Sequence, residues 1–163
     1  MAKNKDIARL QALEVAHRSA AAPSIPKNYV TPSKYSDKTA NGLTKCIIDW
    51  LRFNGHQSER INTQGRVVDK TKVVKDVLGC RRSIGSVEWQ KGSGTKGSAD
   101  ISAIIGGRSV KIEVKSGRDV QSKQQKAYQQ DVEKAGGVYF IAKDFSSFCE
   151  WFDTNFGGPD NEC

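Results

Sequence analysis

The sequence predicts an α/β protein in which a small mixed β-sheet is flanked by helices and interrupted by a basic insert. Three observations carry this prediction: a helical pattern over residues 39–54, two β-rich runs around Gly106-Gly107, and the apolar run VYFIA at 138–142. A helical stretch separates that run from the preceding β-rich run, and strands joined by a helical crossover normally lie parallel. The chain has 163 residues, enough for one domain and short for two.

The N-terminal region is expected to stand apart from the sheet. Residues 3–19 carry only a narrow apolar stripe, so a helix there would be marginal on its own, or would serve as a docking arm. Three prolines follow at positions 23, 26 and 32, which indicates a linker. We therefore expect an arm or linker over 1–38, a compact domain over 39–156, and a loose tail over 157–163.

The helices of the compact domain have clear start and stop signals. In the stretch 39–54, Leu43, Ile47 and Trp50 share one face, and Gly55 suits the left-handed position that ends a helix. A short strand is expected at 58–63. Residues 121–135 are strongly helical up to Gly136-Gly137, and Asp144 is a candidate N-cap for a last helix over 144–156.

Positive charge is concentrated in the insert. The chain has 26 Lys and Arg against 18 Asp and Glu, and residues 60–96 hold nine of the basic side chains and three of the acidic ones. Strands near 73–77 and 86–90 indicate a basic excursion or hairpin. A polyanion, most simply nucleic acid, is the expected partner; the alternative is a basic surface that only keeps the protein soluble. The candidate phosphate contacts are Arg60, Arg66, Lys70, Lys72, Lys75, Arg81, Arg82, Lys91 and Lys96.

The Gly106-Gly107 turn predicts which residues face each other across the hairpin. If these two glycines form the turn, paired residue numbers sum to 213, and Asp100 lies opposite Glu113. At about 5 Å, two carboxylates repel by about 3 kcal/mol in surroundings of intermediate polarity. A divalent cation between them would turn this repulsion into binding, and Lys115 lies on the same face. The alternative is a solvated strand face with alternating charges.

These residues resemble a known family. Gly97-x-x-Asp100, twelve further residues and Glu113-Val114-Lys115 are similar to the core of PD-(D/E)xK nucleases. The later Ser122-x-x-Gln125-Lys126-Ala127-Tyr128 and Ala135-Gly136-Gly137-Val138 resemble the VRR-NUC branch, which includes stand-alone phage nucleases. The similarity covers about residues 39–152 and is most specific over 97–142. It implies a restriction-endonuclease-like core.

The resemblance also implies roles for single residues. Asp100, Glu113 and the backbone carbonyl of Val114 would bind Mg²⁺ or Mn²⁺, Lys115 would be the catalytic lysine, and Gln125 would support the site. Gln124 and Gln129 are alternatives to Gln125. The family often has a glutamate on the first helix, whereas this chain has Ala40-Asn41-Gly42-Leu43 there. Asn41 or Glu59 would have to supply the missing ligand.

The expected function is a metal-dependent DNA endonuclease that acts as a homodimer, with branched DNA as a candidate substrate. A weak or inactive DNA-binding accessory module and an RNA-directed nuclease are the alternatives. The glycine-rich loop 92–98 lacks the Walker A order, so no nucleotide cofactor is expected. Four scattered cysteines, no apolar stretch long enough for a membrane span and no secretory pattern favour a cytoplasmic protein, phage- or prophage-encoded by resemblance.

Overall fold

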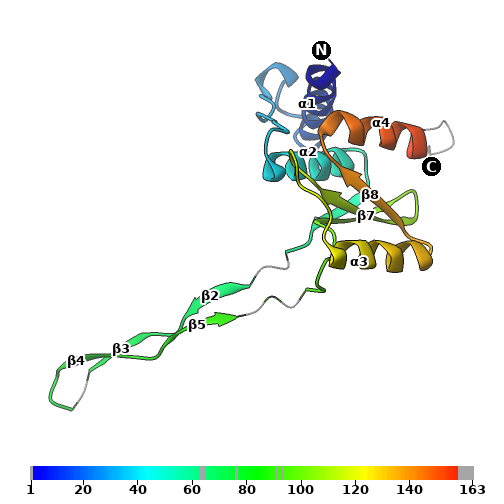
Figure 1. Ribbon diagram of the computed structural model, residues 1–163. Helices are drawn as coiled ribbons and strands as arrows, with labels where there is room; N and C mark the ends of the chain where they lie inside the picture. Colours follow the sequence, from blue (N-terminus) through cyan, green and yellow to red (C-terminus); the bar gives the residue numbers. More distant parts are fainter. Residues whose placement is uncertain (1, 63–64, 76, 91, 93, 158–163) are drawn as a thin grey trace.

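The computed structural model describes residues 2–157 except 63–64, 76, 91 and 93, with side chains from residue 5 onward. The fold is mixed α/β, as predicted, with helices on both sides of a mixed sheet (Figure 1). The described α-helices are α1 (Ala2–Ala21), α2 (Ala40–Phe53), α3 (Lys123–Lys134) and α4 (Phe145–Phe156). The central sheet has the order β1–β6–β7–β8, formed by β1 (Gln57–Arg60), β6 (Ile101–Ile105), β7 (Arg108–Val114) and β8 (Val138–Ala142).

The hairpin register is the predicted one. Ile101 pairs with Ile112 and Ile105 pairs with Arg108, so paired numbers sum to 213. Gly106 and Gly107 have φ values of 54° and 75°, the left-handed conformation that a two-residue hairpin turn needs. Strand β8 runs parallel to β7, which confirms the predicted crossover through α3, and β1 is antiparallel to β6.

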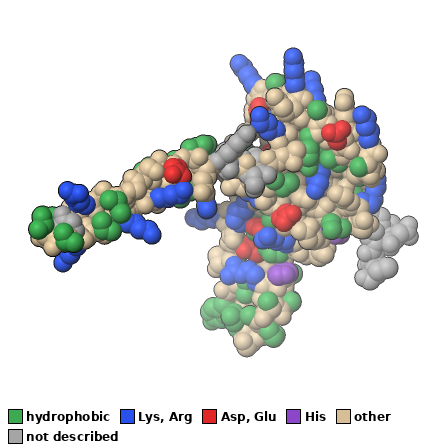
Figure 2. Space-filling view, turned by 90° about the horizontal axis from the view of Figure 1, so that it is seen from below, with side chains coloured by type: hydrophobic (Ala, Val, Ile, Leu, Met, Phe, Trp, Pro, Cys, Tyr) green, Lys and Arg blue, Asp and Glu red, His purple; other side chains and the backbone are tan. Residues whose placement is uncertain are grey.

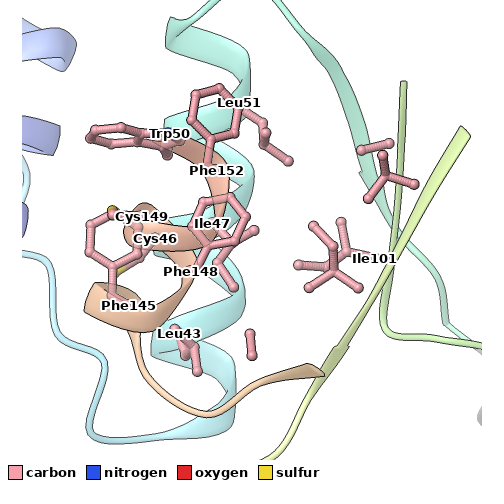
Figure 3. Close-up of a cluster of buried hydrophobic side chains, with 14 of the residues drawn as sticks. Leu43, Cys46, Ile47, Trp50, Leu51, Ile101, Phe145, Phe148, Cys149 and Phe152 are labelled. Carbon is pink, nitrogen blue, oxygen red and sulfur yellow. The ribbon is translucent and has the colours of Figure 1, made fainter. Parts of the chain in front are cut away.

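The hydrophobic core lies between the sheet and the helices α2 and α4. Alternation along β6 and β7 sends one set of side chains to this face, and Ile101, Ile105 and Ile112 are fully buried there. Helix α2 contributes the predicted apolar face, and α4 contributes a cluster of phenylalanines (Figure 3). Helix α3 lies on the opposite side of the sheet (Figure 1), so the polar face of the hairpin is also covered.

Helix α1 is part of this core, which corrects the expectation of a detached arm. Leu10 is fully buried in the same cluster as α2 and α4, and Ile7 and Leu13 pack against that cluster. The buried carboxylate of Glu14 also accepts hydrogen bonds from the Ser33 N–H and Oγ, each at 2.7 Å. These bonds tie the proline-containing segment back onto α1. A narrow apolar stripe suffices because the helix fits against two others.

The basic insert forms a long two-stranded ribbon that projects from the body of the protein (Figure 1). We call residues 65–90 the ribbon. Near its base β2 (Arg66–Asp69) pairs with β5 (Val87–Gln90), and farther out β3 (Lys72–Lys75) pairs with β4 (Arg81–Ile84). The insert is therefore a hairpin, but the two predicted strands are not partners: 72–75 pairs with 81–84, and 87–90 pairs with 66–69, two strands that were not predicted from the sequence. All residues of β3, β4 and β5 are exposed.

Candidate functional site

Two charged side chains are buried on the polar face of β7. Glu113 is 2% exposed and Lys115 is 6% exposed. A solvated strand face with alternating charges, the alternative weighed from the sequence, would leave both open to water. The burial arises because β8 pairs beside β7 and because α3, which packs on β8, places Gln125 against Glu113. Buried charges need partners, because an unpaired charge in the interior costs several kcal/mol.

The carboxylate of Glu113 is held by three side chains. The Lys115 Nζ lies 3.1 Å from the Glu113 Oε1, and the Gln125 Nε2 donates a hydrogen bond to the same oxygen. The Tyr139 hydroxyl donates to the other oxygen, Oε2, at 3.5 Å. The Lys115 Nζ also lies 3.2 Å from Asp119 Oδ2, so it joins two acidic groups.

The start of α3 positions Gln125. Ser122 is the N-cap, and its Oγ accepts a hydrogen bond from the Gln125 N–H at 3.2 Å. In return, Gln125 Oε1 accepts from the Ser122 N–H at 2.9 Å, which completes a capping box. The same Oε1 accepts from Lys115 Nζ at 3.0 Å. Of the three predicted glutamines, Gln125 therefore contacts Glu113 and Lys115, whereas Gln129 bonds to Gln121 and Glu133.

Asp100 lies at the entrance to β6, next to the end of β7. Its Oδ2 accepts a hydrogen bond from the Val114 N–H at 2.9 Å, and the observed pair Ile101–Ile112 places it beside Glu113 in register. Within a strand, the N–H and C=O of one residue point to the same side. The Val114 carbonyl therefore points toward Asp100, as a ligand set of two carboxylates and one carbonyl would require.

The charges on these groups shift each other's ionisation. Burial raises the pKa of Glu113 above the ordinary value for a glutamate, and the negative charge of Asp100 raises it further, while Lys115 opposes the shift. Burial by itself would lower the pKa of Lys115. Its hydrogen bonds to Glu113 and Asp119, with their charges, outweigh burial and raise that pKa. Lys115 is thus a cation at neutral pH.

The site opens into a cavity of about 570 Å³ at the base of the ribbon. Asp100, Lys115 and Gln125 line this cavity from the body of the protein, and Lys96, a predicted phosphate contact, lines it as well. Gly65 at the base of the ribbon, and Gly92 and Gly94 in the segment that follows the ribbon, line another part of the cavity. The cavity therefore borders both the buried charges and the ribbon.

Gly97, the first residue of the Gly97-x-x-Asp100 pattern, lies against the start of α3. Its φ is +79°, and a Cβ on it would lie 2.5 Å from the Gln124 carbonyl carbon and 2.8 Å from the Gln125 N. A glycine is therefore required here both by its backbone conformation and by the close approach of α3. This contact brings the loop before Asp100 against the helix that carries Gln125.

Two carboxylates and a carbonyl fit a Mg²⁺ ion, which commonly binds one or two protein carboxylates and fills its other positions with water or phosphate. The two candidates for a further ligand lie on α2 and β1. Asn41 Oδ1 accepts a hydrogen bond from Arg60 Nη2 at 2.7 Å. Glu59 pairs with Ser102 across β1 and β6. Among the residues that the structure describes, no three His, Cys, Asp or Glu side chains form a metal-binding cluster.

Most of the predicted phosphate contacts lie on the ribbon, away from the buried charges. Arg60 and Lys96 lie outside the ribbon. Arg60 is on β1, where it contacts Asn41, and Lys96 lines the cavity. Lys91 lies outside the described residues. The ribbon carries the other six, namely Arg66, Lys70, Lys72, Lys75, Arg81 and Arg82.

Sequence reasoning missed two residues of the site. Tyr139 pairs with Lys111 across β8 and β7, so alternation along VYFIA places it on the polar face of the sheet. The sequence would have predicted this position of Tyr139 if residues 138–142 had been paired with residues 110–114. Asp119 lies in the loop between β7 and α3, and the sequence offers no periodic signal for its contact with Lys115.

No protein-family model matches the chain, and no curated protein matches it either. In the part of the chain that the structure describes, no helix has both the length and the apolar character to cross a membrane. The class that the geometry defines is thus a mixed α/β protein in which a buried acid–lysine pair, bonded by a glutamine, lies at the base of a basic ribbon.

Proposed function

We propose that the protein is a metal-dependent endonuclease that hydrolyses phosphodiester bonds in DNA. The observation that carries this proposal is the buried pair Glu113 and Lys115, bonded by Gln125 and with Asp100 beside it, opening into a cavity that borders a basic ribbon. Burying a carboxylate next to a second carboxylate costs folding free energy. A function that uses the pair explains why it is kept.

Each residue has a chemical task in this proposal. Asp100 and Glu113 supply hard oxygen ligands, and the Val114 carbonyl supplies a third. Lys115, a fixed cation lining the cavity, stabilises negative charge that develops on the phosphate in the transition state. Gln125 holds Lys115 and Glu113 in one geometry, because its amide donates to the acid and accepts from the amine. When bound, Mg²⁺ or Mn²⁺ would act as a Lewis acid on the phosphate and lower the pKa of a coordinated water.

A DNA-binding accessory module of the same fold is the second candidate. It is favoured by the engagement of Asn41 with Arg60 and by the absence of a three-acid cluster among the described residues. With two acids alone the site would bind a metal weakly, and the ribbon would be the main functional surface.

Nicking of supercoiled plasmid tests the proposal, with linear duplex, a four-way junction and structured RNA as further substrates. We expect cleavage with Mg²⁺ or Mn²⁺, none with EDTA, and a loss of about 100-fold or more in Lys115→Ala. Lys111→Ala is the matched control, because Lys111 lies on the polar face of β7, four residues before Lys115, and bonds to Ser102 instead. Lys115→Met, which keeps the apolar stem, serves if the alanine variant does not fold.

The outcomes separate the candidates. DNA binding without cleavage in any metal would contradict the nuclease and favour the accessory module. Preference for RNA over DNA of similar shape would redirect the activity to RNA. If a species that sediments as a dimer cleaves the junction in preference to the linear duplex, this result would support a homodimer acting on branched DNA. Sedimentation as a monomer with and without DNA would contradict the homodimer.

A further inference from the structure

The ribbon exposes apolar side chains that a stable two-stranded hairpin would cover. Val67 is 61% exposed, Val73 69% and Trp89 65%, and at the outer end Leu78 is 84% exposed and Val77 fully so. An isolated two-stranded ribbon is marginally stable in water unless a third element covers one face. Among the described residues, no helix of the body packs on the ribbon (Figure 1). These side chains are therefore available to a partner.

The outer half of the ribbon is positively charged. Near the base, Lys70 pairs with Glu88 at 2.5 Å, which neutralises both. Residues 71–85 hold four basic side chains and one acidic one. Lys75 lies directly opposite Arg81 across β3 and β4, an arrangement of like charges that weakens a hairpin. Figure 2 shows the basic and hydrophobic side chains along the projecting ribbon.

The ribbon is also placed to reach along a duplex from the site. Its connecting loops line the cavity that holds Asp100 and Lys115. Ten residues from Arg66 to Lys75, at about 3.3 Å each, extend about 33 Å, close to the ~34 Å of one turn of B-form DNA. A phosphate in the cavity and phosphates one turn away could be bound together.

We propose that the ribbon grips duplex DNA, with Lys75 and Arg81 on phosphates and the Val77–Leu78 tip inserted between base pairs in the minor groove. The inference rests on the proposed function, since it names how the same site holds its substrate. Apolar wedges that unstack base steps are a recurrent device of minor-groove proteins. The tip has this composition and lies between the two facing cations.

A second copy of the chain is a less suitable occupant. It would bring another ribbon with the same facing cations against this one, and the net charge of +8 on each copy adds to the repulsion. DNA removes the repulsion between Lys75 and Arg81, whereas self-association increases it.

The salt dependence of duplex binding in EDTA tests the cations without any cleavage. We expect the log–log slope of affinity against salt to become shallower by about two in Lys75→Ala/Arg81→Ala, since each lost phosphate contact removes about 0.9. Lys5→Ala/Lys27→Ala is the matched control, because it removes two exposed cations that lie outside the ribbon and the cavity; its slope should equal that of the wild type. An unchanged slope in the first variant overturns the proposal.

The tip is tested separately with duplexes that carry 2-aminopurine at successive positions. We expect a rise in fluorescence at one step about one turn from the cleavage position, and its loss in Val77→Ser/Leu78→Ser with the salt slope unchanged. If that variant instead turns a dimer into a monomer, the tip is a self-association surface and the proposal is wrong. Binding through the ribbon without cleavage would remove the proposed function and leave this inference standing.

Discussion

Glu113 and Lys115 show how a buried charge survives in a small protein. Each has at least two polar partners, and Gln125 is shared by both. Removing a partner from such a set leaves a charge without compensation, so single substitutions act on stability as well as on chemistry. Asp100 differs from these partners, because its negative charge repels Glu113 instead of compensating it. Substituting Asp100 therefore removes a repulsion and leaves the partners of Glu113 and Lys115 in place.

Asp100→Asn should stabilise the metal-free protein. Burial, and then the charge of Asp100, raises the pKa of Glu113, and an acid with a raised pKa in the folded state destabilises that state at every pH where it is ionised. Removing the Asp100 charge should therefore raise the free energy of unfolding at pH 7 by about 1 kcal/mol. The gain should fade as pH falls through the raised pKa of Glu113 and vanish below the ordinary value for a glutamate.

Urea denaturation in EDTA at pH 7 and pH 4 measures this difference. Asp119→Asn is the control, because Asp119 attracts Lys115 and repels no acid in the contacts described above. It should leave stability unchanged or lower it slightly. An Asp100→Asn protein that is less stable than the wild type at pH 7 would mean that its hydrogen bond to Val114 outweighs the repulsion.

Gly97→Ala should destabilise the protein by more than Gly107→Ala. Both glycines have positive φ, so both substitutions strain the backbone. Only at Gly97 would the new Cβ meet backbone, that of Gln124 and Gln125. We expect about 1 kcal/mol from the strain at either position, and a larger loss at Gly97, measured by thermal unfolding. Equal losses would show that α3 moves away from the loop at little cost.

At the scale of the element, helix α1 should behave as core. Leu10 is fully buried among side chains of α2 and α4. Leu10→Ala should cost about 2–5 kcal/mol, the range for removing a buried leucine side chain. Leu78→Ala, at an 84% exposed position of the ribbon, is the comparison and should change stability by less than about 0.5 kcal/mol. A small effect of Leu10→Ala on denaturant unfolding would mean that α1 detaches.

The elements differ in how far the sequence could predict them. The β6–β7 hairpin has strict alternation and a two-glycine turn, and these local signals determine its register, including the position of Asp100 beside Glu113. The position of Gln125 depends on a local feature as well, the capping box that it forms with Ser122. The packing of α1 was not predictable, because Leu10 becomes buried only through contacts with helices 30 or more residues away.

The burial of the polar face of the hairpin also depends on contacts between segments that are far apart in the sequence. Nothing in the local pattern of β7 distinguishes Glu113 from a solvated glutamate. The difference arises when β8 pairs beside β7 and α3 packs on β8, so that Gln125 meets Glu113. Tyr139 and Asp119 reach the site in the same way, from segments whose position depends on the whole fold.

At the scale of the whole molecule, the body and the ribbon meet at the candidate site. The body supplies a rigid sheet with the acids and the lysine, and the ribbon supplies an exposed basic surface whose base lines the same cavity. In the proposed function these parts separate two tasks, since contacts along the ribbon would determine affinity and the buried cluster would determine the rate. Substitutions in the two parts should therefore change different measured quantities.

Metal binding should appear in the stability of the whole protein, independently of any cleavage. A ligand that binds only the folded state at 100 times its Kd adds about 2.7 kcal/mol, which for a chain of this length raises Tm by about 5–10 °C. We expect this response to Mg²⁺ or Mn²⁺ in the wild type and not to sodium chloride of equal ionic strength. Asp100→Asn should start from a higher Tm and show no response, because a ligand and the repulsion are lost together. A wild-type Tm that ignores both metals, in a protein that still binds duplex DNA, would contradict the paired-carboxylate site and leave the accessory module as the function to pursue.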